Sequence, residues 1–112
     1  VNPARVTDHD TGTVYELDFT RESVKFAENR GFKVDELTVF PVTRSPELFY
    51  YAFRKNHKNV SRSQTDDLLE GMGGMTTALL ERLMQLYNQA ALTHLIATDE
   101  DAVKNAKVTV EL

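Results

Sequence analysis

Alternation of apolar and polar side chains near the N-terminus predicts a β-strand. Over residues 13–19, Tyr15, Leu17 and Phe19 alternate with two acidic residues, which is the period of a half-buried strand. Residues 8–12, DHDTG, are typical of a turn, and the ARVT before them is the candidate second arm of a hairpin. The pattern therefore predicts a small N-terminal β-element.

A helical period follows, from about Arg21 to Arg30. Thr20 is placed to cap this helix, because its hydroxyl can accept a hydrogen bond from a free N–H of the first turn. Gly31 stands where a left-handed residue commonly ends a helix. The segment is therefore predicted to be an amphipathic helix with a defined start and end.

Residues 32–44 carry apolar side chains without a clean period. Pro41 argues against a helix that runs through this segment, and also against a central strand. A short turn followed by extended chain is expected here.

An aromatic-rich helix is predicted from the segment Ser45-Pro46-Glu47 to about Lys58. A serine cap, a proline at the first position and an acid in the first turn favour that start. At 100° per residue, one side of the helix gathers four apolar residues, with Tyr50 on its flank. These four are Leu48, Phe49, Ala52 and Phe53. Tyr51 falls on the opposite, charged side and is therefore predicted to be exposed.

Two further helices are predicted. Ser61 with Gln64 has the spacing of a capping box, and Ser63 with Asp66 is a second possible register for the start of a short helix. Glycines at positions 71, 73 and 74 then predict a hinge or a sharp reversal.

The longest helix is predicted from about Thr76 to Ala97, with an apolar stripe over half its circumference. Leu92 and Ile96 fall on its polar side. Residues 98–112 begin acidic and close with the alternating VTVEL, which predicts either an edge strand or a frayed tail. Together the elements predict a single α+β domain over residues 1–112, mostly helical, with about four helices, a small N-terminal hairpin and a possible C-terminal edge strand.

Composition excludes some classes of site. The chain has 112 residues, a net charge of −4 and no cysteine, which excludes disulfides and thiolate metal ligands and weighs against nucleic-acid binding. No apolar run approaches the roughly 18 residues that span a bilayer. Residues 1–10 lack the apolar stretch of a signal peptide.

No residue pattern indicates catalysis. His9, His57 and His94 have no partner at helical metal-ligand spacing, and the GMGGM segment lacks the lysine of a phosphate-binding loop. We therefore predict a non-enzymatic protein with no catalytic residue, cofactor or metal. The basic run at residues 54–62 is best explained as a solvated helix end, with an acidic protein partner as second choice and nucleic acid after it.

Partner contact is the remaining candidate function. Three side chains interrupt otherwise polar helix faces, and three others are a neighbouring aromatic and two adaptable methionines, whose simpler explanation is core packing. The predicted partner-binding residues are Tyr51, Leu92, Ile96, Tyr50, Met72 and Met75.

The order of these elements resembles a known family. The strand-to-helix segment YELDFTRESVKFAENRGF is followed by PELFYYAFRKNHKNVSRSQTDDLLE and by a long helix with LLERLMQLYNQA. Over residues 13–97 the chain resembles the tail assembly chaperones of long-tailed bacteriophages and of prophages of Gram-positive bacteria.

The resemblance implies a function. Such chaperones coat the tape measure protein in the host cytoplasm, oligomerise, and are absent from the finished virion. A tape measure protein is thus the expected partner, with no nucleic acid and no membrane. Two alternatives remain: a virion structural protein, such as a tail terminator or head–tail connector, and a small DNA-binding regulator that uses the glycine turn.

Overall fold

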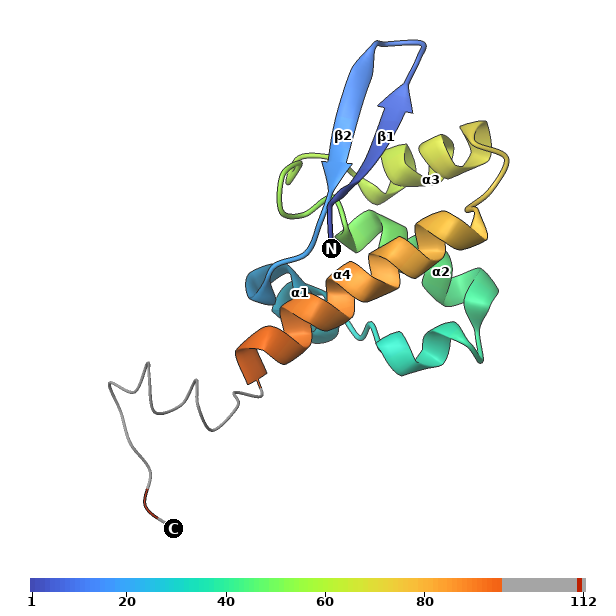
Figure 1. The fold of residues 1–112 in the computed structure, drawn as a ribbon. Coiled ribbons are helices and arrows are strands. Elements are labelled where there is room, and N and C mark those ends of the chain that lie inside the picture. The colour runs from blue at the N-terminus through green and yellow to red at the C-terminus, as the bar shows by residue number, and fades with distance from the viewer. Residues whose placement is uncertain (96–110, 112) are drawn as a thin grey trace.

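The computed structural model describes residues 1–95 and 111, and the side chains of residues 1–92 and 111. Within this part, a two-stranded hairpin projects from four α-helices and one short 3-10 helix (Figure 1). The predicted α+β class is confirmed. The elements are β1 (Ala4–Asp8), β2 (Thr13–Leu17), α1 (Arg21–Asn29), η1 (Val34–Leu37), α2 (Pro41–Tyr51), α3 (Arg62–Gly71) and α4 (Thr77–Leu95).

The N-terminal hairpin is antiparallel, as predicted. Val6 pairs with Tyr15, and Arg5 pairs with Glu16. The outer edge of β2 is occupied by the segment that follows α2. There the backbone N–H of Asp18 donates to the carbonyl of Ala52 at 3.1 Å. The hairpin is therefore joined to the helical body through β2.

The first helix is closed at both ends, as predicted from its sequence. The hydroxyl of Thr20 accepts from the N–H of Ser23 at 3.1 Å, and the hydroxyl of Ser23 accepts from the N–H of Thr20 at 2.8 Å. Gly31 follows the helix with φ of 89°, a conformation that costs a residue with a Cβ atom free energy.

Residues 32–44 differ from the prediction of a turn and extended chain. They contain η1, and α2 then begins at Pro41 rather than after Ser45. Proline is tolerated at the first helical position because its missing N–H would have no intrahelical partner there. Pro46 lies inside α2 and removes one hydrogen bond, the one that the carbonyl of Val42 would accept.

The C-terminal end of α2 was also predicted wrongly. The helix ends at Tyr51, not near Lys58. Turns follow, in which Asn56 and His57 reach the backbone of Glu16 in β2. Contacts with the hairpin therefore favour a helix end that local sequence does not indicate.

The last two helices agree with the sequence pattern. Ser61 and Gln64 form a capping box at the start of α3, and Thr76 accepts from the N–H of Leu79 at 3.1 Å at the start of α4. The reversal between them contains Gly73 and Gly74 with φ of 77° and 105°. The predicted end of α4 at Ala97 and the predicted edge strand lie outside the described residues.

Every described element except α3 contributes buried apolar side chains to one core. Its buried apolar residues are Val6, Leu17, Phe19, Val24, Ala27, Phe32, Leu37, Leu48, Phe49, Tyr51, Ala52, Phe53, Leu83, Leu86 and Tyr87. The α4 residues come from the predicted stripe. In Figure 1 the long α4 runs across the other helices, with α1 beside its C-terminal half.

Tyr51 lies in the core and not on the surface. Its predicted exposure is wrong, because only 7% of the residue is exposed. Its ring lies 6.0 Å from that of Phe26 in α1 and 5.6 Å from that of Phe32. Burial, with Glu47 nearby, raises the pKa of the Tyr51 hydroxyl. A helix has more than one neighbour, and α1 covers the side of α2 that looks polar in isolation.

Candidate functional site

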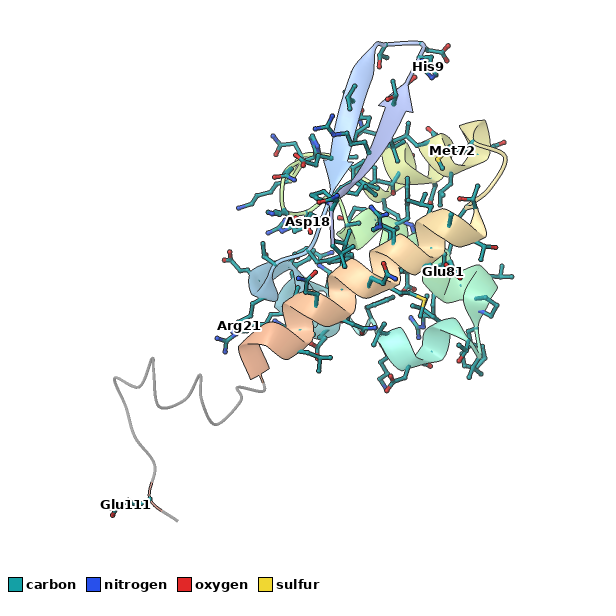
Figure 2. All side chains as sticks on the ribbon, in the orientation of Figure 1. His9, Asp18, Arg21, Met72, Glu81 and Glu111 are labelled. Carbon is teal, nitrogen blue, oxygen red and sulfur yellow. The ribbon has the colours of Figure 1, made fainter. Side chains whose placement is uncertain are left out.

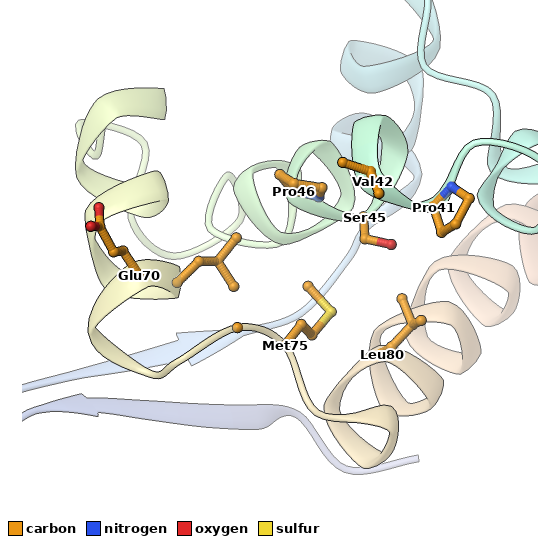
Figure 3. A pocket seen from close by; sticks show the side chains of 9 residues that line it. Pro41, Val42, Ser45, Pro46, Glu70, Met75 and Leu80 are labelled. Carbon is orange, nitrogen blue, oxygen red and sulfur yellow. The ribbon is translucent and has the colours of Figure 1, made fainter.

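A largely apolar groove lies between the start of α2, the end of α3 and the start of α4. It has a volume of about 500 Å³. The residues that line it are Pro41, Val42, Ser45, Pro46, Leu69, Glu70, Gly74, Met75 and Leu80. We call it the α2–α3–α4 groove. Figure 3 shows Val42 and Pro46 on one side of it, with Met75 and Leu80 on the other.

The glycine turn shapes one end of this groove. The N–H of Gly74 donates to the carbonyl of Leu69 at 2.9 Å, and the N–H of Gly73 donates to that of Glu70 at 3.0 Å. These two bonds satisfy carbonyls at the end of α3 and turn the chain back on itself. Met75 is therefore placed directly after the turn, where its flexible side chain lines the groove.

Large apolar side chains extend the apolar surface from Val42, which lines the groove, to Val39 and Phe40 beside it. Val39 is 66% exposed, Phe40 is 53% exposed and Val42 is 88% exposed. Single exposed apolar residues are common on soluble proteins, but a run of them beside an apolar groove is a candidate interaction surface. This run and the α2–α3–α4 groove together form the strongest candidate surface of the described chain.

Arg44 holds the start of α2 against η1. Its guanidinium lies 2.9 Å from the carboxylate of Glu47 and 3.1 Å from that of Glu36. The hydrogen bond to Glu47, with the charge of Glu36 added, raises the pKa of the Arg44 guanidinium. Glu36 precedes the exposed apolar run and Arg44 follows it, so the ion pair between them holds the two ends of that run together.

The charge inside the groove has one sign. Glu70 is the charged residue among those that line it. An apolar groove with one acidic side chain fits an apolar helix face that carries a neighbouring lysine or arginine.

A family model, described as a domain of unknown function (DUF5055), matches residues 2–112. The chain belongs to the DUF5055 family. No curated protein and no solved structure matches the chain.

The structure brings together only part of the predicted partner-binding set in this DUF5055 domain. Met75 lines the groove. Met72 is 40% exposed, but it lines a different cleft, beside the hairpin. Tyr50 is half-buried, with its ring 5.2 Å from the ring of Tyr51. The buried Tyr51 is not available to a partner.

The two predicted residues of the long helix lie elsewhere. Leu92 is 54% exposed, which confirms its predicted exposure. It follows Leu80 by twelve residues, so it lies about 18 Å farther along α4 than the groove. Ile96 lies outside the described residues. A partner role for either residue stays a prediction.

The exposed apolar run at the edge of the groove in the DUF5055 domain was not predicted from the sequence. Val39, Phe40 and Val42 were placed in a turn and an extended segment. The signal that could have found them is three large apolar residues within four positions, next to Pro41 and without a helical or strand period. Without a helical or strand period, the three side chains cannot all face one core. Some of them are therefore expected at the surface.

Of the two histidines whose side chains are described, one accepts a backbone hydrogen bond and the other is exposed. His57 accepts the backbone N–H of Glu16 through Nε2 at 3.0 Å, so this nitrogen has a structural role. His9 is exposed at the tip of the hairpin (Figure 2). Within the described residues, no three His, Cys, Asp or Glu side chains gather in a way that could hold a metal ion. The described helices also include none that is long and apolar enough to cross a membrane.

Proposed function

We propose that the protein is a non-enzymatic chaperone that binds apolar helical segments of another protein in the α2–α3–α4 groove. The observation that carries this proposal is the groove itself, with the exposed Val42 in its wall and the exposed Val39 and Phe40 beside it. The resemblance to phage tail assembly chaperones supports a more specific form. In that form the partner is a tape measure protein, bound in the host cytoplasm.

The energetics of such a surface suit reversible binding. Burying one exposed valine or phenylalanine side chain contributes about 1.5–3 kcal/mol. Lost translational freedom and the ordering of both partners offset much of that gain. A few such contacts therefore give weak binding at each site, and a long partner with repeated apolar segments is held by many copies. A chaperone that must later release its cargo requires that combination.

Co-expression with a tape measure fragment tests the proposal. The wild-type chain is expected to keep the fragment soluble and to co-purify with it. Val42→Glu should abolish this effect, because it places a charge in the apolar surface. Val14→Glu is the matched control, since Val14 is also exposed, at 51%, but lies in the hairpin. The proposal fails if Val42→Glu protects the fragment as well as Val14→Glu does.

The cellular location is a separate part of the proposal. A chaperone is expected in the lysate of infected or induced cells and not in purified virions. Mass spectrometry of virions measures this directly. Stoichiometric amounts of the chain in the particle would instead support a structural component, such as a tail terminator or connector.

Self-association is also part of the proposal. Several copies on one partner are expected to contact each other, and light scattering of the purified chain with and without the fragment measures their number. A single copy per fragment at saturation would contradict this part.

A further inference from the structure

The outer edge of β1 borders a second cleft, between the hairpin and the C-terminal half of α3. The cleft has a volume of about 370 Å³. Its lining residues are Val6, Thr7, Asp8, His9, Asp10, Asp67, Leu68, Gly71 and Met72. No residue of β2 is among them, so the cleft follows the free side of β1. Figure 2 shows its two ends, with His9 at the hairpin tip and Met72 at the end of α3.

The register of the hairpin determines which backbone groups face this cleft. Glu16 uses its N–H and its carbonyl outside the hairpin, with His57 and Asn56 respectively. In an antiparallel ladder, both residues of such a pair point their backbone groups outward, and this alternates along the strands. Arg5 is opposite Glu16, and Thr7 is two residues farther along β1. The N–H and carbonyl of Arg5 and Thr7 therefore point away from β2.

These outward groups have no protein partner among the residues that the structure describes. The two edges of the hairpin thus differ. The edge of β2 is occupied by Asn56 and His57, while the edge of β1 is open beside a helix. An open strand edge is a template for an added strand, and a peptide that adds to such an edge gains main-chain hydrogen bonds.

Charge and shape define what the cleft would accept. Asp8, Asp10 and Asp67 are acidic, and none of them forms an ion pair with a described side chain. Leu68 and Met72 supply an apolar wall on α3. Successive side chains of a strand alternate between two faces. An added strand whose sequence alternates apolar and basic residues would therefore place the two kinds of side chain on opposite faces.

We propose that the edge of β1 binds an extended basic segment of a partner protein by strand addition in this cleft. The surface is separate from the α2–α3–α4 groove, so the proposal does not rest on the chaperone function. Thr7 is the central backbone contact. Asp8, Asp10 and Asp67 attract the basic side chains, and Leu68 and Met72 contact the apolar ones.

A labelled peptide of sequence VKVKVK is a direct probe, with fluorescence anisotropy as the measurement on the full chain. We expect saturable binding that the peptide EVEVEV does not show. A VKVKVK peptide with alternate backbone nitrogens methylated, so that the bonding edge has no donors, should bind much more weakly. Equal binding of the methylated and unmethylated peptides would overturn strand addition, and so would no binding of VKVKVK at millimolar concentration.

Proline substitutions on the two strands form a matched pair. Thr7→Pro removes only an outward N–H, since no hydrogen bond between the strands uses it, and proline is accepted at such edge positions. Loss of one backbone hydrogen bond should weaken VKVKVK binding roughly fivefold. Val14→Pro changes the residue opposite Thr7, on the other edge, and should bind like the wild type. Equal affinity of the two variants would overturn the proposal.

A charge reversal on α3 gives a test that leaves the strands unchanged. Asp67 is exposed, so Asp67→Lys should preserve the fold and weaken binding several-fold at low salt. An unchanged affinity would overturn the proposed role of this carboxylate. Self-association of the free chain that Thr7→Pro abolishes would assign the edge to a second copy instead, and would overturn the proposal of a basic partner segment.

Discussion

His57 accepts a hydrogen bond from the backbone N–H of Glu16, 41 residues earlier in the chain, at 3.0 Å. The bond joins the turn after α2 to the outer edge of β2. The ring of His57 also packs edge-on against Tyr15, with the ring centroids 5.2 Å apart. One side chain thus satisfies a strand edge and covers an aromatic residue of the hairpin.

His57→Ala should therefore lower the free energy of unfolding by about 2 kcal/mol, because it removes both the acceptor and the ring contact. Urea unfolding followed by circular dichroism measures the change. His9→Ala is the matched control, since His9 is exposed in the hairpin turn, and it should change the stability by no more than about 0.5 kcal/mol. Equal stabilities of the two variants would show that the His57 contact contributes nothing.

The burial of Tyr51 leads to a second prediction. Tyr51→Ser removes a ring packed against Phe26 and Phe32 and should cost about 3–5 kcal/mol, as other deletions of buried aromatic rings do. Tyr51→Phe keeps the ring and should cost much less. Thermal unfolding of both variants decides the point. A Tyr51→Ser variant that melts like the wild type would mean that the ring lies at the surface.

Gly74 and Gly71 should respond to alanine with opposite signs. Neither added Cβ atom would have a neighbour within 4 Å, so the backbone decides the outcome. Gly74 has φ of 105°, and Gly74→Ala should destabilise the fold by about 1–2 kcal/mol. Gly71 is the last residue of α3, and Gly71→Ala should be neutral or stabilise by up to about 1 kcal/mol. Denaturant midpoints of the two variants test this, and stabilisation by Gly74→Ala would contradict the described turn.

Tyr87 makes the stability depend on pH in the alkaline range. Burial, with Glu28 and Asp35 nearby, raises the pKa of the Tyr87 hydroxyl to about 12 from an ordinary value of 10. Below pH 10 the hydroxyl is protonated in both states, so its contribution is fully present. Between pH 10 and 12 the unfolded chain releases the proton first, and the free energy of unfolding should fall by about 2 kcal/mol.

Tyr87→Phe is the variant that isolates this effect. Its stability should fall less steeply over the same pH range, because the titrating group is gone while the packed ring remains. Urea unfolding at several pH values measures both slopes. Identical slopes for the variant and the wild type would mean that the Tyr87 hydroxyl titrates alike in both states.

Local chemistry made several elements predictable from the sequence. The bonds of Thr20 and of Ser61 are made within their own first turns, and the positive φ of Gly31 follows from its place after a helix. The second hairpin strand follows from alternation, and the first follows from the turn residues between the two. Each of these signals involves residues a few positions apart, so the surrounding fold does not need to be known.

The wrong predictions concern residues whose burial or conformation depends on contacts with distant parts of the chain. The side of α2 that carries Tyr51 looks polar in isolation, but α1 and Phe32 cover it. The end of α2 depends on β2 and the residue after it, because the carbonyl of Ala52 accepts from the N–H of Asp18 and the side chain of His57 accepts from the N–H of Glu16, 41 positions earlier. The groove was missed for the same reason, since its walls come from three separate helices.

Pro46 and Met75 give the two sides of the groove different stiffness. The proline ring fixes φ of its own residue and restricts the residue before it, and both Pro46 and Ser45 line the groove. Met75 lies on the other side (Figure 3), and methionine has three rotatable side-chain bonds. Under the proposed function, a partner would therefore meet one wall that keeps its shape and one that adjusts to different apolar sequences.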